Sequence, residues 1–221
     1  ILGFEPINLA YYRRAFTHRS SNVTDANGQP VNYERLEFLG DAMLSAVIAA
    51  HLFKEVPSGD EGYLTKMRSK IVSREHLNDL GRELKLLSFV KSKIAPQHFG
   101  DNIHGNLFEA LVGAIYLDRN YAFCEQFIHY RVIKPFVDIP RLEGKITSYK
   151  SLLIEWWQKE KKTFNFDVFE DNNSDGSRFY GVRLSIDGKV IAKARGISKK
   201  KAEEKASQRA YFALQDKITR M

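Results

Sequence analysis

The chain has 221 residues, of which 43% are hydrophobic and 12% aromatic, so it can form one large or two smaller domains with apolar cores and is not intrinsically disordered. Its single cysteine excludes an internal disulfide framework and a multi-cysteine zinc site, which fits a reducing compartment. The excess of basic residues that gives the net charge of +7 lies in the C-terminal part of the chain. Residues 1–140 hold 16 Lys and Arg against 16 Asp and Glu, whereas residues 141–221 hold 18 against 11. A neutral first part and a basic second part predict a tail that binds a polyanion.

No apolar run in the sequence approaches the length of a membrane span, and the beginning, ILGFEPINLAYYRRAF, lacks a signal-peptide pattern. We therefore expect a cytoplasmic protein with no membrane partner. The sequence also begins without a methionine, so we expect that a few residues precede Ile1.

Helical spacing of apolar residues dominates the first part of the chain. It predicts helices over residues 8–16, 33–54, 62–69, 74–86, 106–118 and 121–137, whereas the alternation typical of strands is nearly absent. Residues 21–32, rich in Asn with a glycine and a proline, are predicted to form a loop. The prolines and glycine of PFVDIPRLEGKITSY predict a linker at residues 139–146, after a helical domain over residues 1–138.

The hydrophobic period changes after the linker, and residues 147–221 are predicted to form a second domain. A helix is predicted over residues 148–160, followed by strands at 165–170, 179–186 and 190–194, with a tight hairpin at Asp187-Gly188. The final helix begins after Ser198, a predicted N-cap. Its expected packing face consists of small residues: Ala202, Ala206, Ala210 and Ala213. The order α-β-β-β-α predicts two helices on one face of an antiparallel sheet.

Three acidic residues share one line of the helix predicted over residues 33–54: Glu34, Glu37 and Asp41. At about 100° per residue they lie within an arc of roughly 60°, and no Lys or Arg is interleaved to relieve their repulsion. The same line continues into apolar residues, so we expect the acids to lie at the edge of a buried surface. The opposite stripe, predicted to face the core, contains Leu36, Leu39, Met43, Val47 and Ala50. The acids indicate either a solvated charged face or a bound cation.

The helix predicted over residues 106–118 carries Glu109 among apolar residues. A buried carboxylate is costly unless it is bound to a metal, protonated or paired with a basic residue from elsewhere. Asn106 lies one turn earlier on the same face, and Gly113, one turn later, would let another helix approach closely. The four candidate metal ligands are Glu37, Asp41, Asn106 and Glu109. They supply only oxygen atoms, which suit Mg²⁺ or Mn²⁺, ions that commonly serve phosphoryl chemistry.

Three lysines, Lys199, Lys200 and Lys201, stand at the start of the final helix. Free backbone N–H groups and the helix dipole favour anions at such a position. A lysine run can also serve only to keep a surface soluble. In a basic module, we predict that these lysines contact phosphate.

Several of these segments resemble ribonuclease III. The stretch ERLEFLGDA resembles the family's signature, GNLFEALVGAIYLD resembles its second acidic box, and AFTHRS and DEGYLTKMRSKIVS resemble the flanking boxes. The C-terminal segments from ITSYKSLLIEWW to GISKKKAEEKA resemble a double-stranded-RNA-binding domain. The resemblance covers almost the whole chain, and several motifs in the right order are far more specific than one short box.

The resemblance implies an all-α endonuclease domain that homodimerises, followed by an α-β-β-β-α double-stranded-RNA-binding domain. The implied activity is metal-dependent hydrolysis of double-stranded RNA to 5′-phosphate and 3′-hydroxyl ends, in rRNA and mRNA processing. The implied cofactor is Mg²⁺, with Mn²⁺ as a substitute.

Residue roles follow from the same resemblance. Asp41 and Glu109 match catalytic acids, and they match metal ligands together with Glu37. Acids lining the active-site valley are matched by Glu34 and Glu61, and RNA-binding positions by Glu155, Lys199, Lys200 and Lys201. Phe38 matches an aromatic residue that enters the partner subunit, although an ordinary core phenylalanine also fits the helix pattern. Thr17 and His18 match the opening box, where we expect structural hydrogen bonds.

Two positions depart from the family's pattern. Asn106 stands where the family commonly has Asp; it keeps one carbonyl oxygen but loses the charge, so we expect weaker metal binding. The alternative function is a non-catalytic double-stranded-RNA-binding protein that retains the fold. The first hairpin loop, DNNSDGSR, lacks the histidine with which related domains often reach the minor groove.

Basic residues on the helix after Glu61 add a further expectation. Lys66, Arg68 and Lys70 either contact the RNA backbone or form a plain solvated face. A metal phosphohydrolase acting on nucleotides would leave the C-terminal module without a role, so it is the least supported function.

Overall fold

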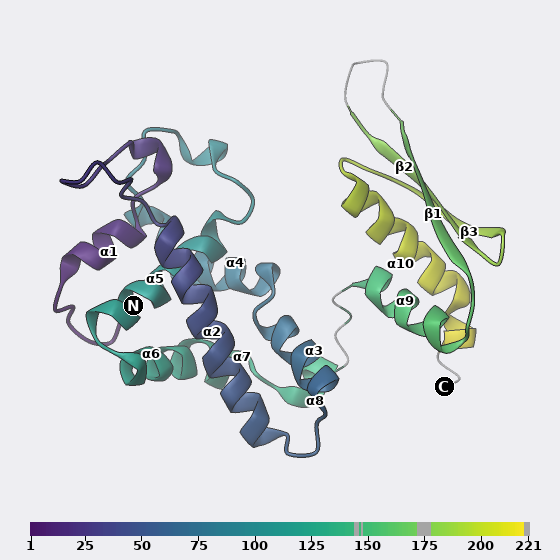
Figure 1. Ribbon diagram of the computed structural model, residues 1–221, viewed down its shortest axis with the longest axis horizontal. Coiled ribbons are helices and arrows are strands. Elements are labelled where there is room, and N and C mark those ends of the chain that lie inside the picture. The colour runs from purple at the N-terminus through teal and green to yellow at the C-terminus, as the bar shows by residue number, and fades with distance from the viewer. Residues whose placement is uncertain (144–145, 147, 172–177, 219–221) are drawn as a thin grey trace. The chain divides into compact units, whose positions relative to one another are not determined.

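The computed structural model describes residues 1–143, 146, 148–171 and 178–218, and of residues 216 and 217 only the backbone. The chain divides into two compact units, Ile1–Lys145 and Ile146–Met221. The first unit is helical, and the second contains a three-stranded sheet with two helices (Figure 1). This confirms the predicted fold class of a helical domain followed by an α-β-β-β-α domain.

The helices of the first unit follow the predicted order. They are α1 (Leu9–Ala15), η1 (Arg19–Ser21), α2 (Glu34–Glu55), α3 (Glu61–Ile71), α4 (Arg74–Glu83), η2 (Leu86–Phe89), η3 (Pro96–His98), α5 (Ile103–Asp118), α6 (Tyr121–Ile128), η4 (His129–Ile133), α7 (Lys134–Phe136) and α8 (Ile139–Glu143). The helix predicted over residues 121–137 is divided by η4, a π-helical turn. This turn lies just before Pro135, which has no N–H to donate to the helix.

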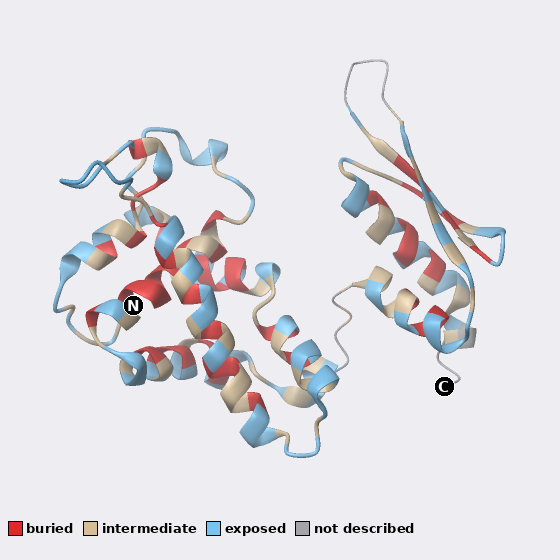
Figure 2. Ribbon diagram, in the orientation of Figure 1, coloured by how far each residue is buried: buried red, intermediate tan, exposed pale blue. Residues whose placement is uncertain are grey.

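The core of the first unit is built around the crossing of α2 and α5, and Figure 2 shows buried residues along both helices. A Cβ atom on Gly40 would overlap the Glu109 carbonyl, and a Cβ atom on Gly113 would overlap the Leu36 carbonyl. Both helices therefore approach each other through glycine, as predicted for Gly113. The close approach buries α5 on nearly all sides.

The buried face of α2 differs from the predicted stripe. Its buried residues are Leu36, Gly40, Leu44, Val47, Ile48 and Leu52, whereas Leu39 and Met43 are only partly buried. The core face is thus closer to the acid line, which continues into buried Ile48 and Leu52 as expected. Contrary to the expectation that no apolar run approaches the length of a membrane span, α2 could cross a membrane by length and composition alone. Its buried residues pack in the core of this unit, as in a soluble protein's central helix.

Helix α8 occupies residues that the sequence predicted to be a linker, and it packs on α3. Lys70, predicted to lie on a solvated or RNA-facing side, is only 5% exposed. Its Nζ donates hydrogen bonds to the carbonyls of Leu142 (2.6 Å) and Glu143 (3.0 Å). The last carbonyls of a helix have no partners within it, and Lys70 supplies donors for two of them. The prediction of an outward-facing Lys70 is wrong for this reason. The predicted linker includes the division between the two units at 145/146, but its residues 139–143 are helical.

The second unit consists of α9 (Tyr149–Lys159), β1 (Phe164–Glu170), β2 (Tyr180–Ile186), β3 (Lys189–Gly196) and α10 (Lys199–Ile218). The strands are antiparallel in the order β1-β2-β3, and both helices lie on one face of the sheet (Figure 1). Leu153, Trp157, Val182 and Leu184 form the core against three alanines of α10. These are Ala202, Ala206 and Ala210, whereas Ala213, also predicted for this face, is exposed.

Candidate active site

A cavity of about 810 Å³ lies beside the crossing of α2 and α5, and we call it the acidic pocket. Its acidic lining residues are Glu34, Glu37, Asp41, Asp101 and Glu109. Asn106 also lines it, so the structure brings all four predicted metal ligands to one cavity. The reason is the glycine crossing: Glu37 and Asp41 flank Gly40 in the sequence, and Gly40 packs on the backbone of Glu109.

The carboxylates of the acidic pocket repel one another. Burial, followed by the charges of Asp41 and Glu37, raises the pKa of Glu109 to about 7, against the opposing charge of Arg74. Burial and the charge of Glu34 likewise raise the pKa of Glu37, which Arg74 lowers. The repulsion predicted from the sequence is therefore present in the folded protein. Near neutral pH, Glu109 can therefore either keep its proton or face a bound cation as a carboxylate.

Asn106 is held by a residue that the sequence did not single out. Tyr33 is buried, which raises its pKa, and a hydrogen bond with the Asn106 side chain opposes this shift. Asn106 and Tyr33 both line the acidic pocket.

The acidic pocket fits a hard divalent cation in the kind of atoms it offers. Its candidate ligands are carboxylate and amide oxygens, and burial together with neighbouring acids raises the pKa of Glu37 and of Glu109. Among the residues that the structure describes, no three His, Cys, Asp or Glu side chains are already grouped as a metal site. Small side-chain movements would therefore have to accompany metal binding.

The remaining predicted residues of the first unit differ in position. Glu34 lines the acidic pocket and forms an exposed ion pair with Arg19 (3.8 Å). Glu61, at the start of α3, accepts a hydrogen bond from the Thr65 hydroxyl (3.1 Å) and does not line this pocket. Phe38 lies at the pocket and is 80% exposed, which excludes the interpretation as a core phenylalanine.

Thr17 and His18 make structural hydrogen bonds, as expected. The Thr17 hydroxyl donates to the Arg13 carbonyl (2.7 Å), and His18 Nδ1 lies 2.8 Å from the Ser20 hydroxyl. The buried His18 ring packs against Phe99, and burial lowers its pKa. His18 thus forms part of the wall of the acidic pocket.

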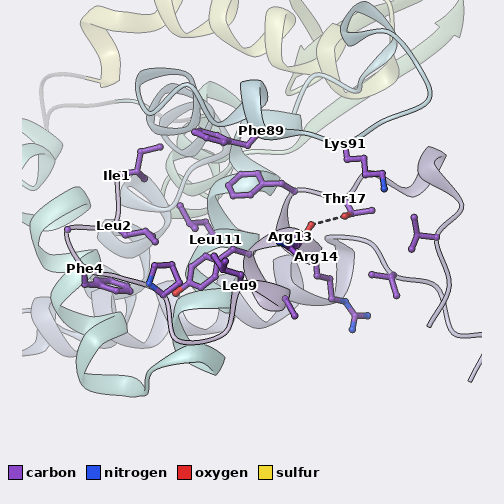
Figure 3. Close-up of a pocket in the computed structure, with 17 residues that line it drawn as sticks. Ile1, Leu2, Phe4, Leu9, Arg13, Arg14, Thr17, Phe89, Lys91 and Leu111 are labelled. Atoms are coloured by element: carbon purple, nitrogen blue, oxygen red, sulfur yellow. Dashed lines mark hydrogen bonds between the residues drawn. The ribbon is translucent and has the colours of Figure 1, made fainter. Parts of the chain in front are cut away.

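A second cavity, of about 900 Å³, lies beside α1 and has a different character (Figure 3). Apolar residues line most of it, among them Leu2, Phe4, Phe89 and Leu111. Its described lining residues include no Asp or Glu, so it offers no carboxylate to a metal ion. The acidic pocket is therefore the candidate active site.

The start of α10 in the second unit presents the predicted lysines to solvent. The Ser198 hydroxyl accepts a hydrogen bond from the Lys201 backbone N–H (3.2 Å), which confirms Ser198 as the N-cap. The side chains of Lys199, Lys200 and Lys201 are exposed, and Lys199 Nζ lies over the ring of Tyr180 (5.7 Å).

The two acidic residues that follow these lysines in α10 contact α9 instead of the lysines. Glu203 pairs with Lys150 (2.6 Å) on α9, and Glu204 accepts a hydrogen bond from the Tyr149 N–H (2.6 Å). Within the described part of the chain, the three lysines consequently form no ion pair. Glu155, the other predicted RNA-binding residue, is exposed on α9. The hairpin loop predicted to lack a groove-reading histidine falls at residues 172–177, outside the described residues.

Sequence reasoning missed Arg74, Tyr33 and Asp101, which also belong to the acidic pocket. Arg74 is the first residue of α4, a position where the helix dipole favours an acid rather than a base, and this signal was not used. No periodicity connects it to α2 or α5. Only the packing of the helices reveals that these residues share a cavity.

Comparisons with known proteins agree with both units. Residues 9–136 match a family model described as ribonuclease-III-like, and residues 149–214 match the double-stranded RNA binding motif. Ribonuclease 3 of Flavobacterium psychrophilum is 67% identical over 218 residues, which cover 99% of this chain and 89% of that protein.

Solved structures give the same result for the first unit. The nuclease domain of ribonuclease III from Campylobacter jejuni has a TM-score of 0.53 and 30% identity, covering 62% of this chain and 92% of that chain. Another structure of that domain, with a TM-score of 0.53 and 29% identity over 61% of this chain and 93% of that chain, concerns flexibility in a region involved in dimer formation.

Proposed function

Because the chain belongs to the ribonuclease III family, we propose that it hydrolyses phosphodiester bonds of double-stranded RNA, leaving 5′-phosphate and 3′-hydroxyl ends. The observation that carries this proposal is the acidic pocket, in which carboxylates from α2 and α5 converge without enough positive charge. The double-stranded RNA binding motif on the same chain indicates that the substrate is double-stranded RNA.

The acidic pocket is proposed to hold Mg²⁺, or Mn²⁺ as a substitute, through Glu37, Asp41, Asn106 and Glu109. A bound divalent ion polarises the phosphate and lowers the pKa of a coordinated water. Glu109, with a pKa of about 7, can release its proton near neutral pH and become a ligand. Tyr33 keeps Asn106 in place through their hydrogen bond.

A homodimer is supported by an exposed apolar stripe on α2. Phe38, Ala42, Ala49 and Phe53 recur at helical spacing beside the acid line. Phe38 and Phe53 are 80% and 73% exposed, Ala42 is exposed and Ala49 is partly buried. A second copy that covered this stripe would bury both phenylalanines. Two acidic pockets would then face one duplex, and Glu61, at the start of α3, is proposed to line the valley between them.

The second unit is proposed to recognise the shape of the RNA duplex. A-form RNA exposes phosphates and 2′-hydroxyls across a shallow minor groove, which a rigid α-β-β-β-α module can contact with little sequence preference. Lys199, Lys200 and Lys201 would contact phosphates, and Glu155 would contact the duplex from α9. We further propose a cytoplasmic protein acting in rRNA and mRNA processing.

The direct experiment is incubation of the pure protein with a long RNA duplex, with Mg²⁺ and then with EDTA. We expect cutting only with the metal, and neither single-stranded RNA nor duplex DNA should be cut. Binding of the duplex without any metal-dependent cutting would instead support the non-catalytic alternative, in which Asn106 has disabled the site.

A further inference from the structure

Two basic residues line the acidic pocket, and they differ in how they are held. Arg19 pairs with Glu34 at 3.8 Å. Arg74 is exposed, and its guanidinium has neither an ion pair nor a hydrogen bond with any of the described residues. Its donors therefore remain available at the edge of a cavity that is otherwise rich in acids.

The backbone of Arg74 is fixed in place by the packing of α4 on α5. Ser73 caps α4 by accepting a hydrogen bond from the His76 N–H (3.4 Å). A Cβ atom on Gly81 would overlap the His104 carbonyl, so α4 lies against the first turn of α5. The buried Asn78 side chain accepts a hydrogen bond from the Gly105 N–H (2.8 Å), one of the backbone donors that a helix start leaves unpaired.

These contacts hold the middle and the end of α4 against the first turn of α5, and Arg74, at the start of α4, lines the same pocket as Asn106 and Glu109. The position of Arg74 relative to the candidate metal ligands is thus set by backbone packing rather than by a flexible loop. The positive charge of Arg74 interacts with carboxylates on both helices, since it lowers the pKa of Glu37 on α2 and of Glu109 on α5. It nevertheless forms no ion pair with either carboxylate.

We propose that Arg74 binds a non-bridging oxygen of the RNA phosphate that enters the acidic pocket, an inference that rests on the proposed nuclease function. A pocket with several carboxylates repels phosphate, and a bound divalent ion offsets only part of this repulsion. A planar guanidinium presents parallel N–H donors that match two phosphate oxygens. Arg74 is the residue of the pocket whose guanidinium is free to do this.

The competing explanation is that Arg74 only balances the charge of Glu37 and Glu109. The two roles differ in the salt dependence of RNA binding. A plot of log Kobs against log salt has a negative slope, and its magnitude decreases by about 0.9 for each phosphate that the protein no longer neutralises. A balancing charge that touches no phosphate leaves this slope unchanged.

The test compares Arg74→Gln with Arg74→Lys and with Arg13→Gln, which alters an exposed arginine of α1 outside the acidic pocket. Duplex RNA binding is measured with Mg²⁺ over a range of salt concentrations, in a Glu109→Gln background to prevent cutting. We expect Arg74→Gln to weaken binding about 10-fold and to lower the slope by about 0.9, the value for one phosphate. Arg74→Lys should keep the slope but bind less tightly than wild type, and Arg13→Gln should change neither.

Steady-state cleavage is measured in the otherwise wild-type protein. Arg74→Gln should lower kcat/KM about 10- to 100-fold, with an increase in KM. Unfolding temperatures should match that of wild type, because Arg74 is an exposed first residue of a helix whose Ser73 cap is retained.

Titration of Mg²⁺ without RNA separates the two explanations further. A change in Mg²⁺ affinity with an unaltered salt slope would mean that Arg74 is only a balancing charge, and the inference would be wrong. Equal effects of Arg74→Gln and Arg13→Gln would also overturn it. If wild type binds but never cuts RNA, the proposed nuclease function fails, while the salt slope still decides whether Arg74 contacts phosphate.

Discussion

The acidic pocket and the start of α10 are both proposed to contact RNA phosphates, yet they carry opposite charge and depend on the fold in different ways. In the pocket, the half-buried Glu37 and Glu109 lie near other carboxylates, and the pKa of Glu109 is raised to about 7. At the start of α10, three lysines stand in water and lack ion pairs within the described residues. The lysines are presented by one capped helix, whereas the acids of the pocket come together because two helices approach closely through glycines.

The largest expected effect comes from the pocket. Replacing Glu109 by Gln removes a candidate metal ligand while keeping its shape, so cleavage should fall at least about 10³-fold. RNA binding should be retained, because the lysines of α10 lie in the other unit. Gel analysis of a radiolabelled duplex and a binding assay measure the two. Glu55→Gln, on the last turn of α2, is the matched control and should cut normally. Joint loss of cutting and binding would show that Glu109 is structural.

The next effect comes from α10. Replacing Lys199, Lys200 and Lys201 together by Ala should weaken RNA binding about 10- to 100-fold, and lower the salt slope by about 0.9 for each phosphate that is no longer bound. The kcat at saturating RNA should stay the same, since the acidic pocket is unchanged. Filter binding at several salt concentrations measures this. A control triple of exposed lysines, Lys161, Lys189 and Lys193, should have less effect. A weakening confined to one RNA sequence would contradict recognition of shape.

A smaller effect is expected from restoring charge to the pocket. Asn106→Asp adds a carboxylate, so the Mg²⁺ concentration for half-maximal cutting should fall about 5- to 10-fold. Tyr33→Phe in the wild-type background should move this concentration upward, because Asn106 then loses its hydrogen-bond partner. A Mg²⁺ titration of the cleavage rate measures both. An Asn106→Asp protein that cuts while wild type does not would favour the non-catalytic alternative for the natural chain.

The smallest effect concerns the pH dependence of folding. The pKa of Glu109 is raised above the ordinary value of 4.5 to about 7, so the protonated form is preferred in the metal-free folded protein. Its contribution to stability is present below pH 4.5 and is lost as the pH rises through 7. Glu109→Gln should therefore stabilise the metal-free protein at pH 8 by about 1–2 kcal/mol relative to its effect at pH 4.5. Urea unfolding in EDTA at both pH values measures this, and an equal effect at both would contradict the raised pKa.

Much of the fold followed from short-range patterns. The six predicted helices of the first unit, the three strands and the Ser198 cap follow from spacing, alternation or a capping residue within a few positions, whereas α8 and the π-helical turn do not. The repulsion among the acids of α2 was also predictable, because helical geometry fixes which residues share a face. Residue roles beyond this came from family resemblance and stay predictions until the substitutions above are tested.

The sequence by itself determined most of the elements, the charge division and which acids share a face of α2, because periodicity and spacing act locally. The crossing of α2 and α5, a tertiary feature, brought the four candidate ligands to one pocket. Tertiary structure alone decided that Phe38 is exposed, that Lys70 is buried under the carbonyls of α8, and that Arg74 faces the acids. These outcomes depend on how closely whole helices approach and cross. No stretch of sequence around Arg74 contains that information, because Gly81 and Asn78 of α4 set its position against the start of α5.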